Sequence, residues 1–169
     1  MIWINLFAIL ILVISLLGGL REGAVRHTFN LVITLIAIPL AGLSYRLLAI
    51  ALAFLPGENW ENFVGFFITL AVISVILQLI TLLPRKIIQK IWKKGLLFRL
   101  LGGVLNAVNA SIGMTVFTLV LLAYPIFDWL ARAVVSSTVL ANLVSIFGFI
   151  QVMLPEVFQA VAGLMVTLM

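Results

Sequence analysis

The fold of this chain is decided by an apolar stretch near its middle. Residues 63–83 read FVGFFITLAVISVILQLITLL, with no charged side chain among them. A helix of about 20 apolar residues crosses the hydrocarbon core of a bilayer, and it makes all of its backbone hydrogen bonds internally. The stretch therefore predicts a membrane-spanning helix.

Apolar segments on either side of this stretch extend the same pattern. The expected spans are residues 2–17, 28–46, 63–83 and 101–124. Pro39 is expected to kink the second of them. Of the 169 residues, 65% are hydrophobic and 9% are charged, whereas about a quarter of the residues in a soluble domain are charged. We therefore expect an all-α integral membrane protein with four transmembrane helices in a single membrane domain.

Basic residues are distributed unevenly over the connections between these spans. Arg21 and Arg26 lie in the first connection, no Lys or Arg lies in the second, and six of the ten lie in the third. Because loops rich in Lys and Arg stay in the cytoplasm, the first and third connections are expected there. The N-terminus and everything after Tyr124 are then expected on the periplasmic or outer side of a bacterial inner (cell) membrane.

The third connection has a pattern of its own. Pro84 is expected to end the third span, so that residues 85–94 form a separate basic helix at the cytoplasmic interface. The lysines expected to contact anionic lipid headgroups are Lys86, Lys90, Lys93 and Lys94.

Two further regions are expected on the outer side. Arg46 is expected to reach the headgroups at the end of the second span, and residues 47–54 to form a short helix along the surface. The tail, residues 126–169, is expected to be amphipathic and to lie on the outer surface or against other subunits. A fifth span over residues 134–154 is left open. Arg132 is the one basic residue after Tyr124, and a single basic residue does not determine on which side of the membrane the tail lies.

The fourth span carries a stripe of small and polar residues. Four of them recur at spacings of four, three and four and therefore share one face of a helix: Gly102, Asn106, Asn109 and Gly113. Three small residues lie beside them: Gly103, Ala107 and Ala110. Small residues let helices approach closely in lipid, and asparagine hydrogen-bonds across the contact. The stripe is interpreted as a contact with another span of this chain, a subunit interface, or the lining of an oligomeric pore.

Few residues have the potential for catalysis or ligand binding. The chain has no cysteine, its acidic residues fall in loops or interfaces, and no histidine lies in an expected span. The group formed by Arg21, Glu22, Arg26 and His27 is interpreted as a solvated topology determinant with a local ion pair. We therefore expect no catalytic residue, no metal and no cofactor, and a protein that is not an enzyme. The expected partners are anionic lipid headgroups and other membrane subunits, identical or different, and not nucleic acid.

Several short motifs, taken together, resemble one family of bacterial inner-membrane proteins. The chain opens with Met1-Ile2-Trp3-Ile4-Asn5 and has Gly23-Ala24-Val25-Arg26 after the first span, followed by a helix that contains Leu31. Further along come Arg99-Leu100-Leu101-Gly102, then Trp129 and Ser137, and finally Leu154-Pro155. In order and spacing these residues resemble the colicin V production protein (CvpA) family, whose inner-loop motif matches Arg21, Gly23 and Arg26.

The chain departs from the family pattern at three places. Glu22 stands where the family usually has an arginine before the glycine, and Phe98 stands where an aspartate is common. In the fourth span, Asn106-Ala107-Val108-Asn109-Ala110 replaces a Gly-x-x-Arg-Gly pattern, so any role of that arginine is not carried over.

The resemblance implies a role in colicin V production or export and in envelope homeostasis. Two hypotheses follow for the mode of action. In the first, the protein is a non-enzymatic scaffold or accessory component that uses the fourth span and the tail as contact surfaces. In the second, it is a homo-oligomeric channel with Asn106 and Asn109 facing the lumen.

Overall fold

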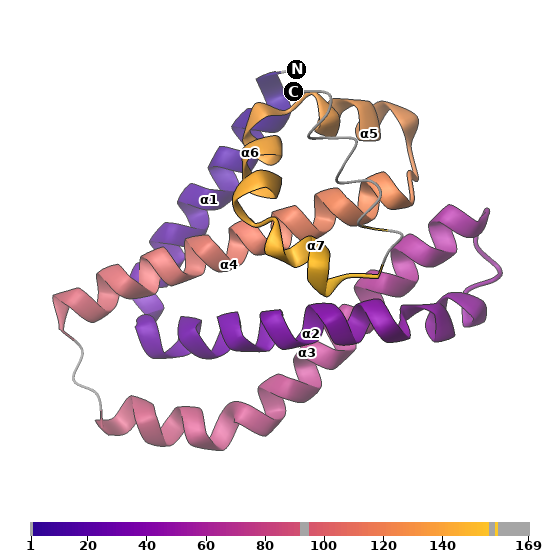
Figure 1. Ribbon diagram of the computed structural model, residues 1–169. Coiled ribbons are helices and arrows are strands. Elements are labelled where there is room, and N and C mark those ends of the chain that lie inside the picture. Colours follow the sequence, from indigo (N-terminus) through magenta and orange to yellow (C-terminus); the bar gives the residue numbers. More distant parts are fainter. Residues whose placement is uncertain (1, 92–94, 156–157, 159–169) are drawn as a thin grey trace.

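The computed structural model describes residues 2–91, residues 95–155 and Phe158, and this part of the chain is helical with no strand (Figure 1). The helices are α1 (Ile2–Glu22), α2 (Ala24–Ala51), α3 (Glu58–Ile91), α4 (Leu96–Ala123), α5 (Asp128–Val135), α6 (Thr138–Ile146) and α7 (Phe149–Met153). The first four are long and apolar enough to cross a membrane. The expectation of an all-α chain with four spanning helices is confirmed.

The break between the first two helices is shorter than predicted. The expected connection over residues 18–27 is helical except at Gly23, which separates α1 from α2. Charged residues at a membrane interface do not end a helix, because the backbone hydrogen bonds continue through them. Gly23 does end it, since its φ of +86° is a conformation that residues with a side chain rarely adopt. The first two spans are therefore joined by a one-residue turn.

The expectation that Pro84 ends the third span was wrong. Pro84 lies inside α3, which continues to Ile91, and Pro39 likewise lies inside α2. A proline removes one backbone donor and kinks a helix, but membrane helices tolerate this. Figure 1 shows α3 bending in its C-terminal part. Up to Ile91 the expected interfacial helix is thus the end of α3, and residues 92–94 lie outside the described residues.

The other boundaries shift in the same direction. α2 runs on through Arg46 to Ala51, so most of the expected surface helix over residues 47–54 is the end of α2. α3 begins at Glu58 and α4 at Leu96, five residues earlier than expected in each case. Hydropathy marks the part of a helix that lies in lipid, whereas the helix itself extends beyond it.

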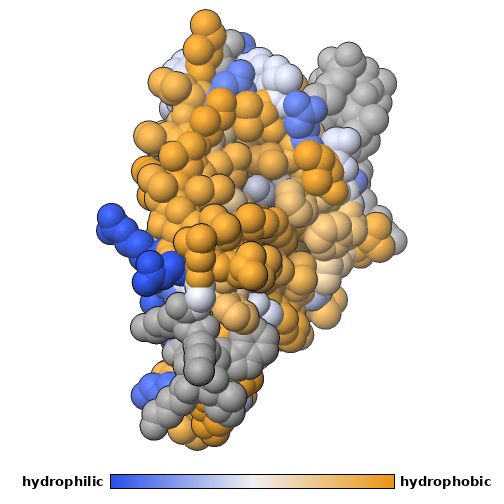
Figure 2. Space-filling model, turned by 90° about the vertical axis from the view of Figure 1, so that its left-hand side faces the viewer, coloured by the Kyte–Doolittle hydropathy of each residue, from blue (hydrophilic) through white to orange (hydrophobic). Residues whose placement is uncertain are grey.

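The fourth spanning helix is the centre of the bundle. α4 packs on α1 and α2 and contacts α6, whereas it touches α3 only slightly (Figure 1). Within the most apolar 18-residue segment of each helix, 44% of the residues of α4 are buried, compared with 17% in α1 and 11% in α3. α3 packs on α2, where Gly65 lets the backbones approach: a Cβ there would lie 3.2 Å from Cα of Ala49. Apolar side chains cover most of the face shown in Figure 2, as expected of a surface in lipid.

The segment after α4 folds back onto the bundle in short pieces. α5 and α6 meet at 71°, the geometry of a broken span or a re-entrant loop, so residues 134–154 do not form one straight helix. The break occurs at Ser137, whose Oγ accepts a hydrogen bond from the Leu140 N–H and donates one to Asn5 Oδ1 at 2.6 Å. This second bond ties the start of α6 to α1. The part of the expected tail over residues 159–169 lies outside the described residues.

Candidate functional site

The backbones of α1 and α4 meet at a pair of glycines. A Cβ built on Gly102 would lie 2.6 Å from the Gly19 carbonyl oxygen and 2.6 Å from the carbonyl carbon of Gly23. Real Cβ atoms do not approach this closely, so neither side of the contact has room for a side chain. Beside it, the Leu20 side chain lies over Gly103, where a Cβ would be 2.9 Å from Cδ2. Gly102 of the predicted stripe and Gly103 beside it therefore face α1 of the same chain.

Asn106 adds a polar contact one turn further along α4. Its Nδ2 donates a hydrogen bond of 2.6 Å to the backbone carbonyl of Ser15 in α1. In lipid, such bonds between helices contribute about 0.6 kcal/mol on average, so this one defines the register of the contact more than it drives the packing. The Asn106 amide is thus used within the chain.

The other half of the stripe has no such partner. Asn109 Oδ1 is buried and accepts no hydrogen bond from the described residues. Gly113 is exposed, and a Cβ there would meet nothing within 4 Å. The neighbouring Ala107 and Ala110 are half-buried, and the Ala107 carbonyl accepts a bond from Ser111 Oγ. The stripe therefore divides into Gly102 and Asn106, which contact α1, and Asn109 and Gly113, for which the described residues supply no comparable partner.

The group around the turn from α1 to α2 is only partly solvated. Glu22 forms an ion pair with Arg26 at 2.9 Å, and its second carboxylate oxygen lies 3.3 Å from His27 Nε2. Arg21 is exposed, whereas His27 is 2% exposed, so the expectation of a solvated His27 was wrong. The cause is the one-residue turn at Gly23, because α2 already begins at Ala24 and its first turn carries His27 into the bundle.

Only one of the four predicted lipid-contacting lysines can be placed. Lys86 is exposed near the end of α3. Lys90 belongs to the same helix, but its side chain lies outside the described part of the structure, as do Lys93 and Lys94. Contact of these lysines with anionic lipid stays a prediction.

The opposite end of the bundle holds a cluster that the sequence analysis missed. The hydroxyls of Tyr45 and Tyr124 are hydrogen-bonded at 2.6 Å, and Arg46 Nε donates to Tyr45 Oη at 3.4 Å. Burial and the hydrogen bond to Tyr45 raise the pKa of Tyr124, which lies just past the end of α4. The rings of Phe66 and Phe158 pack against Tyr45, each with a centroid distance of 6.0 Å. The two tyrosines are 79 residues apart, so no local pattern indicates their pairing.

A cavity of about 540 Å³ opens beside this cluster. Its lining residues are Arg46, Ala49, Ile50, Glu58, Glu61, Asn62 and Tyr124. Charges of both signs face it, and Asn62 and Tyr124 are buried in its wall. Within the described part of the chain, no three His, Asp or Glu side chains lie together as metal ligands would.

A polar residue of α3 was also not predicted from the sequence. Gln78 is an exposed amide within the expected span over residues 63–83, and its side chain makes no hydrogen bond to the described residues. One polar residue in a long apolar run hardly changes the hydropathy of the run, so the sequence pattern does not draw attention to it. Its position in the helix is nevertheless visible in the sequence.

The contact between α1 and α4 makes a prediction about two glycines of the same helix. Gly102→Ala is expected to lower the free energy of unfolding by about 1–3 kcal/mol, because the added methyl forces the two backbones apart. Gly113→Ala is the matched control and is expected to be neutral or to stabilise the helix by up to about 1 kcal/mol. Both are measured by denaturant titration in detergent micelles with circular dichroism. Equal effects of the two substitutions would contradict the observed packing.

Comparison with known proteins identifies the family. The family model described as colicin V production protein matches residues 4–148, which is most of the chain. No curated protein and no solved structure is similar enough to be matched with it. The match includes the turn at Gly23, the contact of Gly19 with Gly102, and the Asn5–Ser137 bond. The chain therefore belongs to the colicin V production protein family.

Proposed function

We propose that this protein is a non-enzymatic scaffold of the inner membrane, which acts in colicin V production or export, and with it in envelope homeostasis, through contacts between membrane helices. Membership of the colicin V production protein family supports a role in this process. The proposed mode of action rests on one observation, the exposed amide of Gln78 in α3.

Gln78 lies at a depth where its amide needs a partner. It is five residues from the middle of residues 63–83, or about 7.5 Å along a helix, and so within a hydrocarbon core about 30 Å thick. An amide that makes no hydrogen bond in such surroundings costs several kcal/mol. Since no described residue of the chain accepts or donates this bond, a second membrane helix is the partner that satisfies it.

The surface around Gln78 suits such a contact. α3 is the least covered of the four spanning helices, and the apolar side chains on either side of the amide, Val75 and Leu79 among them, are exposed. If a second copy places its own α3 here, a twofold axis brings the two Gln78 amides together, and each donates to the other. The contact surface is then α3, while α4 holds each copy together.

The proposal predicts a defect in Gln78→Leu. The wild type is expected to contain two copies in native-lipid nanodiscs, and the substitution to raise the dissociation constant of the dimer about three- to twentyfold. Secretion of colicin V is measured in cells whose own copy of the protein has been replaced by the variant, and it is expected to fall in parallel. Subunit number is measured by native mass spectrometry and secretion by growth inhibition of a sensitive strain.

The matched control is Asn142→Leu, an exposed polar residue of α6 that is expected to change neither quantity. If Gln78→Leu leaves subunit number and secretion unchanged, the scaffold proposal is wrong. If secretion falls while the wild type is a monomer, the partner at Gln78 is a different membrane protein and the dimer is wrong.

A second candidate function, a homo-oligomeric channel lined by α4, is favoured by one observation. Asn109 Oδ1 and Thr118 Oγ1 are buried polar atoms of α4 without a hydrogen-bond partner among the described residues, and water that entered the bundle from a lumen would satisfy them. Because Asn106 already bonds to α1, Asn109 is the residue that distinguishes this function from the scaffold.

The channel predicts a change in ion selectivity. In planar bilayers, Asn109→Asp is expected to increase the preference for cations over anions, because it adds a negative charge to the lumen. The reversal potential under a salt gradient measures this preference. An absence of conductance in both the wild type and the variant would rule out the channel.

A further inference from the structure

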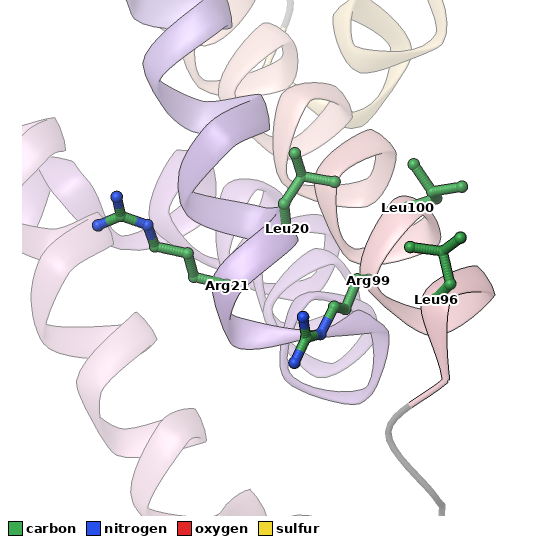
Figure 3. A pocket seen from close by; sticks show the side chains of 5 residues that line it. All are labelled: Leu20, Arg21, Leu96, Arg99 and Leu100. Carbon is green, nitrogen blue, oxygen red and sulfur yellow. The ribbon is translucent and has the colours of Figure 1, made fainter.

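We infer that a cleft at the junction of α1 and α4 binds an anionic phospholipid of the cytoplasmic leaflet. The cleft has a volume of about 500 Å³ and is lined by Leu20, Arg21, Leu96, Arg99 and Leu100 (Figure 3). It lies beside the contact of Gly19 with Gly102, where the last turn of α1 passes the first turns of α4.

The walls of the cleft suit an acyl chain. Leu96 and Leu100 are one turn apart on α4, and Figure 3 shows them one above the other on the same side of the helix. Both are exposed, and Leu20 closes the cleft from α1, held in place over Gly103. An apolar slot that opens at the side of a spanning helix is accessible to lipid.

The two arginines are free to bind a phosphate. Neither Arg21 nor Arg99 forms an ion pair or a side-chain hydrogen bond with another described residue, and both are exposed. Glu22, the acidic residue of this end of the bundle, is already ion-paired with Arg26. A guanidinium donates two parallel hydrogen bonds to a phosphate, and basic pockets between spanning helices on the cytoplasmic side bind anionic headgroups.

The placement of the arginines favours a lipid over a free phosphate ion. In Figure 3 Arg21 extends to the side of α1 that faces away from α4, whereas Arg99 lies under the last turn of α1. The two guanidinium groups therefore lie on different sides of α1 and do not converge on one point. A small ion is held by convergent donors, whereas a headgroup that is anchored by its acyl chain meets charges on both sides.

The charge of the surroundings points the same way. The described segments at this end, residues 18–30, 84–91 and 95–100, contain six Lys and Arg residues and one acidic residue, Glu22. By the bias of basic residues this is the cytoplasmic end, where anionic lipid is attracted. The cleft differs from the predicted lysine contacts because it combines charge with an apolar slot.

The test is lipid binding to the purified full-length protein, measured by native mass spectrometry with short-chain phosphatidylglycerol and phosphatidylcholine. Phosphatidylglycerol is expected to bind at least about tenfold more tightly. Arg21→Gln and Arg99→Gln are each expected to weaken it about fivefold, and together about 25-fold, with no change in phosphatidylcholine binding. Since both side chains are exposed and unpaired within the described residues, the melting temperature is expected to stay the same.

Two control variants separate binding in the cleft from attraction to the basic surface around it. Lys86→Gln removes one positive charge at the same end but outside the cleft, and is expected to change binding less than twofold. Leu100→Gln changes the slot without changing charge, and is expected to weaken both lipids. The inference is wrong if the two lipids bind the wild type equally or if Lys86→Gln weakens binding as much as Arg99→Gln does. It is also wrong if millimolar glycerol 3-phosphate displaces the lipid completely, because the site would then recognise phosphate alone.

Discussion

The structure depends on the direct contact of two backbones, that of α1 at Gly19 and that of α4 at Gly102. The same glycine of α4 also lies against Gly23 and Ala24, so α1, α4 and the start of α2 meet at one point. Lipid offers no hydrophobic force that pulls two apolar helices together, and close approach of small residues is therefore what holds them. With these three helices positioned, Asn106 reaches the Ser15 carbonyl and the cleft between Leu20 and Leu100 takes its shape.

Some polar side chains of the bundle are satisfied within the chain and others are not. Along α4, Ser111 and Thr115 bond to carbonyls of their own helix and Asn106 bonds to α1, so these groups are satisfied within the chain. Gln78 in α3 and Asn109 in α4 are not satisfied by described residues, and the two functional candidates differ in which of them they satisfy. In a scaffold a second helix bonds to Gln78, whereas in a channel water bonds to Asn109.

Much of the fold was predictable because one strong physical signal governs it. A run of about 20 apolar residues can only cross a bilayer as a helix, and four such runs gave the four spans. The sequence also singled out Gly102 and Asn106, but it could not name their partners, because Gly19 and Ser15 lie far away in the first span, Ser15 91 residues from Asn106. Helix ends were predicted less well: Pro84 lies inside α3, and His27 is buried because a single glycine makes the turn. Gln78 was not predicted as a contact residue, because one polar side chain hardly changes the mean hydropathy of a long apolar run.

The most direct test of the packing of α1 on α4 uses the absence of cysteine from the chain. Cysteines introduced together as Leu20→Cys and Gly103→Cys would lie within disulfide reach, since a Cβ at Gly103 is 3.1 Å from Cγ of Leu20. Oxidation in native membranes, followed by electrophoresis and maleimide labelling, shows which thiols have reacted. The structure predicts a disulfide within one chain, seen as a monomer whose thiols are protected. Disulfide-linked dimers would contradict it, because α1 would then pack against α4 of another copy.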